Sequence, residues 1–87
     1  MYNLVFFSYS LDISLQEYIE SQKNAIENQF PDLVIEHVNE NDYRLSKFSK
    51  KPFRFPTIIL FKNNARKDIL RAKISNQDLE AWLKLRL

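Results

Sequence analysis

Phe53-Arg54-Phe55-Pro56-Thr57-Ile58-Ile59-Leu60-Phe61-Lys62-Asn63-Asn64 is the stretch that decides the fold of this 87-residue chain. Residues 57–61 are β-branched or apolar throughout, which is typical of a strand buried on both faces of a sheet. Pro56 has no backbone N–H to donate, so it fits the first position of that strand. Asn63 and Asn64 tolerate positive φ, which predicts a two-residue hairpin into a return strand over residues 65–73.

Three segments earlier in the chain predict two more strands and a short helix. Residues 3–9 and 33–38 have the apolar centres of strands. Residues 43–49 indicate a short helix, with Tyr43, Leu45 and Phe48 available to the core.

A longer helix is expected between the first two strands. Apolar residues recur there with a 3.6-residue period over residues 15–30, and Pro31 ends the pattern. Ser14 with Glu17 three residues later matches a capping box, whereas Asp12 as the cap would start the helix two residues earlier.

The last helix has its own start signal and apolar face. Ser75 with Asp78 forms a second capping box, and Leu79, Trp82 and Leu83 share one side. The order of elements is then β-α-β-α-β-β-α. A right-handed crossover makes the first two strands parallel, and the hairpin adds an antiparallel pair. We therefore predict one α/β domain over residues 1–87, with a mixed four-stranded sheet and helices on both faces.

Composition excludes several functions. No cysteine occurs, so the chain has no disulfide, no thiol catalysis and no thiolate metal site. The hydrophobic fraction of 45% is enough to bury a core rather than leave the chain disordered. The net charge is +2, but residues 1–43 carry −7 and residues 44–87 carry +9. The asymmetry reflects either ordinary solvated faces or a polarised surface that steers a partner.

The central stretch is similar to a known family. Phe55-Pro56-Thr57-Ile58-Ile59-Leu60-Phe61-Lys62-Asn63 resembles the proline-threonine strand of thioredoxins, and residues 75–83 resemble their final helix. The resemblance covers nearly the whole chain and implies a minimal thioredoxin-like fold, nearer in size to glutaredoxins. It also implies a cis Phe55–Pro56 peptide, although Asn-Asn replaces the family's usual Asn-Gly turn.

The residues that carry thioredoxin chemistry are missing from the matching positions. Alignment on the first strand puts the family's Cys-x-x-Cys pair at Asp12 and Leu15, and the proton-accepting aspartate of many thioredoxins at Phe6. Neither a carboxylate nor a leucine performs thiol–disulfide exchange. The resemblance therefore implies a redox-inactive member that is not an enzyme and uses no cofactor.

His37 is the only histidine. It precedes the end of its strand, which is expected near the end of the first strand, where Ser8, Ser10, Ser14 and Asp12 lie, so a Ser-His-Asp arrangement is conceivable. A single histidine in a strand is more often structural, and one histidine with scattered acids gives no metal-ligand spacing. We expect neither a catalytic triad nor a metal site.

The resemblance also implies a contact surface where the first strand's end, the first helix's start and the cis-proline loop meet. The residues expected there are Leu11, Asp12, Ile13, Arg54, Phe55 and Pro56. Leu11 and Ile13 either form an exposed protein-binding rim or fill the space that cysteines would occupy. Phe55 is a contact residue or a core residue. An acidic or extended partner segment, held by strand-type pairing, is the expected ligand.

Cations interleaved with aromatic residues in the second half also fit nucleic acid. The basic patch comprises Arg44, Lys47, Lys50, Lys51 and Arg54, and it is followed by Arg66, Lys67, Arg71 and Lys73. The acidic first helix counts against this alternative. We therefore favour a protein–protein interaction or structural assembly subunit over a small nucleic-acid-associated basic protein.

Membrane association is not expected from the sequence. No apolar run approaches the length of a membrane span, and the first residues lack a signal-peptide pattern. The expectation is an intracellular, cytoplasmic location without a membrane partner.

Overall fold

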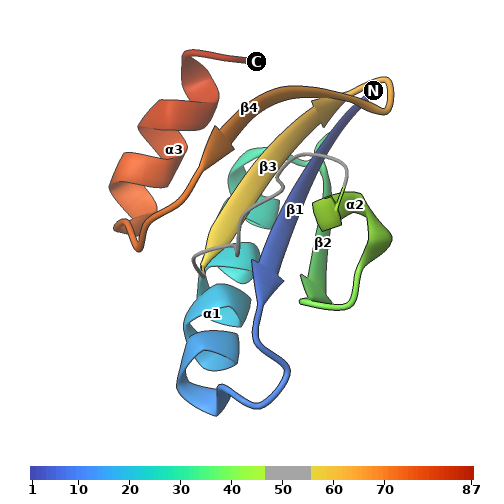
Figure 1. The fold of residues 1–87 in the computed structure, drawn as a ribbon. Helices are drawn as coiled ribbons and strands as arrows, with labels where there is room; N and C mark the ends of the chain where they lie inside the picture. The colour runs from blue at the N-terminus through green and yellow to red at the C-terminus, as the bar shows by residue number, and fades with distance from the viewer. Residues whose placement is uncertain (47–55) are drawn as a thin grey trace.

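A computed structural model describes residues 1–46 and 56–87 of the chain. The elements follow the predicted order: β1 (Tyr2–Ser8), α1 (Ile13–Gln29), β2 (Val34–Asn39), α2 (Tyr43–Ser46), β3 (Thr57–Lys62), β4 (Ala65–Leu70) and α3 (Asn76–Lys84). Figure 1 shows the sheet with α1 and α3 packed against it.

The four strands form one mixed sheet in the order β2-β1-β3-β4. β1 is parallel to β2 and antiparallel to β3, and β3 is antiparallel to β4, as the crossover and hairpin predicted. Asn63 and Asn64 have φ values of 51° and 68°. The turn therefore has the two positive φ angles of a type I′ hairpin without using glycine.

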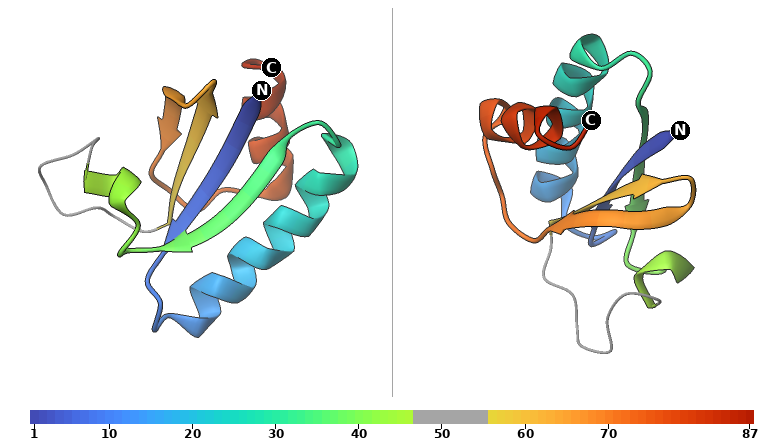
Figure 2. Two further views of the ribbon diagram at one scale, coloured as in Figure 1. Left: turned by 90° about the vertical axis from the view of Figure 1, so that its right-hand side faces the viewer. Right: turned by 90° about the horizontal axis from the view of Figure 1, so that it is seen from above.

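The core has two parts, one on each face of the sheet. Leu4 and Phe6 of β1 pack on the side of α1 and α3, whereas Val5 and Phe7 pack on the side of α2. Leu45, which is 5% exposed, is the side chain of α2 that joins this second cluster. β3 is buried from residue 57 to residue 61, which confirms the strand buried on both faces, and it begins at Thr57, one residue after the expected Pro56. Helices lie on both faces, as predicted (Figure 2).

Helix α1 begins with a different cap from the capping box that the sequence favoured. Asp12 is the N-cap, and its Oδ1 accepts a hydrogen bond from the Leu15 N–H at 2.9 Å. The earlier start occurs because a carboxylate three residues before Leu15 satisfies a free N–H of the first turn. The inner face of the helix is buried as its period predicted, through Leu15, Ile19, Gln22 and Ile26.

One strand end and one side chain differ from expectation. β4 ends at Leu70 rather than at residue 73. Tyr43, expected in the core, is 68% exposed, because residues two apart lie on different sides of a helix and Leu45 is the one that faces the sheet. Phe48 lies outside the described residues.

Helix α3 is connected to α1 through the backbone of Ile74. The Tyr18 hydroxyl donates to the Ile74 carbonyl and accepts from the Ile74 N–H at 2.9 Å. The Gln22 amide donates to the same carbonyl at 2.7 Å. Next along the chain, Ser75 caps α3 by accepting from the Asp78 N–H, which confirms the predicted start of the last helix.

Candidate functional site

The loop between β1 and α1 exposes apolar side chains beside the sheet. Leu11 is 93% exposed, Ile13 70% and Tyr9 49%. Leu15, at the position of the family's second cysteine, is 4% exposed and belongs to the core. Of the two alternatives for Leu11 and Ile13, exposure is therefore the one observed, and Leu15 fills the interior.

Hydrogen bonds fix the backbone of this loop although its side chains face solvent. The Asp12 N–H donates to the Tyr9 carbonyl at 3.2 Å. The side-chain amide of Gln16 donates to the carbonyls of Tyr9 and Ser10 at 3.3 and 2.6 Å. The exposed groups are thus presented on an ordered backbone, which lowers the entropy cost of binding.

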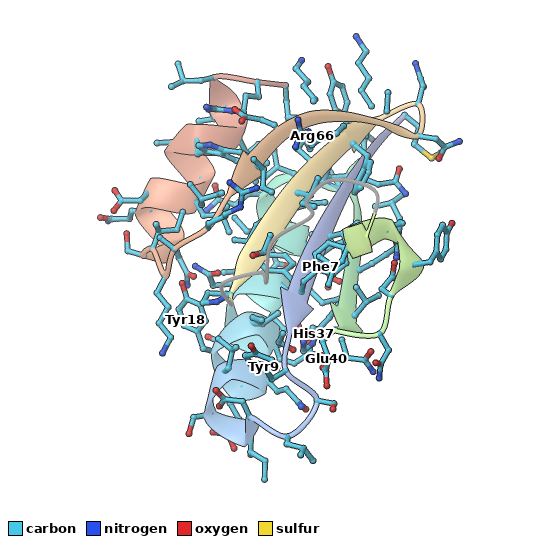
Figure 3. The ribbon with its side chains drawn as sticks, in the orientation of Figure 1. Phe7, Tyr9, Tyr18, His37, Glu40 and Arg66 are labelled. Carbon is cyan, nitrogen blue, oxygen red and sulfur yellow. The ribbon has the colours of Figure 1, made fainter. Side chains whose placement is uncertain are left out.

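Glu40, in the turn after β2, holds the same loop from the other side. Its two carboxylate oxygens accept from the Ser10 N–H at 2.7 Å and the Ser10 hydroxyl at 2.9 Å. Hydrogen bonds from its own backbone N–H and from Ser10 lower the pKa of Glu40 below its usual 4.5. The carboxylate is therefore ionised at neutral pH. Figure 3 shows Tyr9 and Glu40 at the same end of the sheet.

We define the α1 rim as Tyr9, Leu11, Asp12, Ile13, Ser14 and Glu40, which line a hollow of 480 Å³. Pro56 reaches this end of the sheet because the next residue, Thr57, pairs with Phe7 near the end of β1. Pro56 itself is buried. Arg54, Phe55 and the proposed cis peptide lie outside the described residues.

His37 contacts a serine and an acid, in the order of a catalytic triad. Its Nε2 is 2.8 Å from the Ser8 Oγ, and its Nδ1 is 3.3 Å from a Glu20 carboxylate oxygen. The acid comes from α1 and is not the expected Asp12. Sequence reasoning missed Glu20 because it lies on the outer face of the helix, where a carboxylate usually has only water as a neighbour.

The geometry of this relay favours a structural role. Ser8 is 1% exposed, so a substrate has almost no access to the hydroxyl. With the proton on Nδ1, His37 donates to Glu20 and accepts from Ser8, which connects the middle of α1 to the ends of β1 and β2. A polar hollow of 620 Å³ adjoins the relay.

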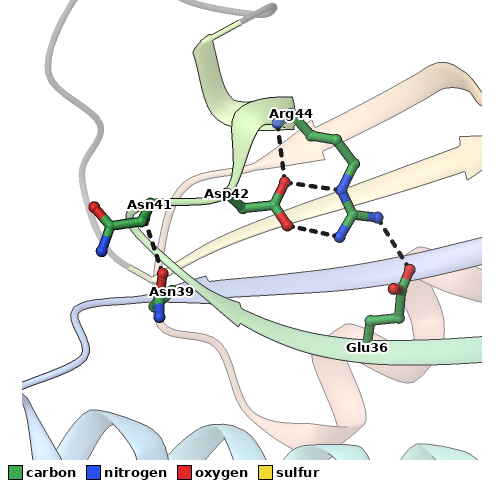
Figure 4. A network of polar contacts seen from close by, with 5 residues as sticks. All are labelled: Glu36, Asn39, Asn41, Asp42 and Arg44. Atoms are coloured by element: carbon green, nitrogen blue, oxygen red, sulfur yellow. Dashed lines mark hydrogen bonds and ion pairs between the residues drawn. The ribbon is translucent and has the colours of Figure 1, made fainter.

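Arg44, the described member of the predicted basic patch, is engaged within the molecule. Its guanidinium contacts Asp42 at 2.9 Å and Glu36 at 3.1 Å (Figure 4). The hydrogen bond from Arg44 lowers the pKa of Asp42, and the same contacts raise the pKa of Arg44 above its usual value. The other patch residues, Lys47, Lys50, Lys51 and Arg54, lie outside the described residues.

Several of the later cations also contact groups of this chain. Lys67 donates to the Tyr2 hydroxyl at 3.2 Å and to the Arg86 carbonyl at 2.7 Å. The Lys73 Nζ lies 5.3 Å from the centre of the Tyr18 ring. These intramolecular contacts reduce the number of cations available to phosphate groups.

Within residues 1–46 and 56–87, no group of three or more metal-binding side chains occurs. None of the described helices has the length and apolar composition needed to cross a membrane.

Solved thioredoxin structures superpose on this chain. Thioredoxin-2, a component of malaria parasite protein secretion machinery, aligns with a TM-score of 0.78 and 21% identity, over 99% of this chain and 84% of that one. Another solved structure, described only as that of a malarial protein, aligns with a TM-score of 0.76 and 22% identity, over 100% of this chain and 98% of that one. Thioredoxin O2 from Arabidopsis thaliana aligns with a TM-score of 0.74 and 14% identity, over 99% of this chain and 75% of that one.

No protein-family model and no curated protein matches the sequence. The structural likeness, at identities of 14% to 22%, concerns the fold. The chain therefore has the thioredoxin-like fold that its sequence predicted, and it contains no cysteine with which to form the Cys-x-x-Cys motif of thioredoxins.

Proposed function

We propose that this chain is a redox-inactive thioredoxin-like domain that acts inside the cell through protein–protein contact, as an interaction or assembly subunit. The observation that carries the proposal is the exposure of Leu11 and Ile13 on a hydrogen-bonded loop. They lie where α1 begins, on either side of Asp12, the position that the resemblance assigns to the first cysteine of thioredoxins.

The α1 rim has the properties of a small contact site. Burying large apolar side chains such as Leu11 and Ile13 contributes about 1.5–3 kcal/mol each. Their backbone is already ordered, so less of that free energy is lost when a partner binds. The ionised Glu40 and the Asp12 carboxylate flank the apolar groups. The described part of the rim therefore favours a partner with cationic groups beside apolar ones.

The expected acidic partner segment would require the cations that precede Pro56 in the sequence. Arg54, Lys50 and Lys51 are the residues concerned, and they lie outside the described residues.

The redox part of the proposal is tested by insulin reduction in the presence of dithiothreitol. We expect the rate to equal that of the control without protein, because thiol–disulfide exchange needs a thiolate. A rate clearly above that control would contradict the proposal.

The contact role is tested by affinity purification from an extract of the source cells, with the tagged chain as bait. The proposal expects proteins that are retained by the wild type and lost with Leu11→Ser/Ile13→Ser. Leu85→Ser is the matched control, because Leu85 is 85% exposed and lies after α3. Equal retention by all three baits would contradict the role of the α1 rim as the contact site.

The nucleic-acid alternative makes a separate prediction. Single-stranded and duplex oligonucleotides would then bind with micromolar affinity at physiological salt, and the affinity would fall steeply as salt increases. We expect no such binding, because Arg44 and Lys67 already contact groups of this chain. A steep salt dependence together with tight binding would favour the alternative.

A further inference from the structure

β2 lies at one edge of the sheet. It pairs in parallel with β1 from Val34 to Asn39, and within the described residues no strand pairs with its outer edge. The left view of Figure 2 shows β2 crossing the middle of the molecule, between α1 and α2. Alternate backbone N–H and C=O groups of an edge strand point away from the sheet, where an added strand can bind them.

The opposite edge of the sheet has more features that discourage an added strand than β2 has. β4 carries Arg66, Lys67 and Asp68, and its pairing with β3 shifts register between Leu60 and Phe61. Charged residues and bulges are the usual protection of sheet edges. β2 has the sequence Val-Ile-Glu-His-Val-Asn, without lysine, arginine or proline, and its register with β1 is regular over six residue pairs.

Most of the described charged residues around β2 are acidic. Asp32 precedes the strand, Glu36 lies within it, Glu40 follows it, and Glu20 lies beside it on α1 through His37. No lysine or arginine occurs between Pro31 and Tyr43. Arg44 pairs with Glu36 and Asp42, which leaves Asp32, Glu20 and Glu40 without an arginine or lysine partner in any ion pair of the described residues.

This charge selects the kind of strand that fits. A second copy of the chain, added edge to edge, would bring acidic residues close to acidic residues, and like charges across strands are destabilising. A strand with lysine or arginine would meet complementary charge instead. The side chains of β2 also provide apolar contacts: Val34 is 40% exposed, and Ile35 and Val38 are half-buried.

We propose that the outer edge of β2 binds an extended, basic segment of a partner protein by strand addition, with backbone hydrogen bonds to β2 and lysine or arginine side chains near Asp32 and Glu40. Such binding adds a fifth strand to the sheet and uses a recognition mode known for exposed sheet edges. The site differs from the α1 rim, because it needs neither Leu11 nor Ile13.

The test uses two seven-residue peptides with blocked ends, Val-Lys-Val-Lys-Val-Lys-Val and the same sequence with glutamate in place of lysine. Amide exchange and chemical shifts of the isotope-labelled full chain are followed by NMR. We expect the lysine peptide to slow exchange of the outward-facing amides of β2 and to leave β4 unchanged, whereas the glutamate peptide has no effect. Protection of β4 instead, or equal effects of the two peptides, would overturn the proposal.

Two variants sharpen the test. Asp32→Lys and Val34→Lys place cations beside the edge and should weaken the lysine peptide roughly twofold to fivefold each, the range for one unfavourable cross-strand pair. Leu11→Ser/Ile13→Ser should bind the peptide like the wild type. If the α1 rim turns out not to bind a partner, the result for β2 is therefore unaffected. Unchanged affinity in both lysine variants would overturn the proposal. Protection of β2 that grows with protein concentration, without peptide, would also overturn it by showing that a second copy is the occupant.

Discussion

Leu11 and Leu15 lie four residues apart at the start of α1, and they have opposite environments. Leu11 is 93% exposed, whereas Leu15 is 4% exposed. The same contrast separates Ile13, which is 70% exposed, from the fully buried Ile19. Identical side chains in one short segment thus have two environments, and mutations can test the proposed contact role separately from folding.

The difference comes from where the helix begins. Leu15 and Ile19 lie on the inner stripe that the helical period turns toward the sheet. Leu11 precedes the N-cap Asp12 and lies outside that stripe. Gln16 and Glu40 hold the loop in place through backbone atoms and Ser10, so its apolar side chains are not needed to order it.

The largest effect should appear in a matched pair of substitutions. Leu15→Ala removes a core side chain and should lower the free energy of unfolding by about 2–5 kcal/mol. Leu11→Ala should change it by less than about 0.5 kcal/mol, as is usual for exposed positions. Urea denaturation measures both. Comparable losses for the two variants would remove the contrast on which the proposed function depends.

Tyr18→Phe should give the next largest effect. It removes the hydroxyl that binds both backbone groups of Ile74, and a part-buried N–H then loses its partner. We expect a loss of about 1–3 kcal/mol in the free energy of unfolding. The Leu11 and Ile13 environment should not change, which near-identical NMR shifts of residues 9–13 would verify. A neutral substitution would show that the link between α1 and α3 contributes little.

The cap of α1 predicts a smaller difference. Asp12→Ala should destabilise the chain by about 1 kcal/mol, because the Leu15 N–H loses its acceptor. Ser14→Ala is the matched control and should have almost no effect, since Ser14 lies within the first turn. Thermal melts measure the melting temperatures of both variants. A larger loss for Ser14→Ala than for Asp12→Ala would contradict the Asp12 cap and support the capping box of Ser14 and Glu17.

Acid should release the loop while the inner face of α1 stays packed. Because the folded-state pKa of Glu40 is lowered, the stabilisation it gives is present above its usual pKa of 4.5 and is lost as pH falls through the lower folded pKa. The Ser10 amide proton shift should report this titration by NMR. Glu40→Gln should abolish the titration, and a Ser10 amide that does not respond to acid would contradict the role of Glu40.

Local sequence signals predicted the parts of the fold that depend on them. Asn63 and Asn64 predicted the hairpin, and the apolar period predicted the buried face of α1. The choice between Asp12 and Ser14 as the cap depends on which acceptor reaches a free N–H, and both residue types are good caps. The exposure of Tyr43 depends on which side of α2 packs against the sheet, and in the structure that side carries Leu45.

The candidate site was predictable in part. The resemblance to thioredoxins placed Leu11, Asp12 and Ile13 together, but composition could not say whether the two apolar residues were buried. The contacts of Glu40 with Ser10, and of Glu20 with His37, join residues 30 and 17 positions apart. Pairings over such distances follow from packing, and a single sequence contains no direct signal of them.

The central claim is that the exposed residues at the start of α1 bind a partner and do not support the fold. It is tested most directly by measuring the dissociation constant of the retained partner and the melting temperature for the same three proteins, the wild type, Leu11→Ser/Ile13→Ser and Leu85→Ser. We predict that the double variant weakens binding at least about tenfold, equivalent to about 1.4 kcal/mol, while all three melt within a few degrees of one another. A double variant that melts many degrees lower and still binds like the wild type would contradict the claim.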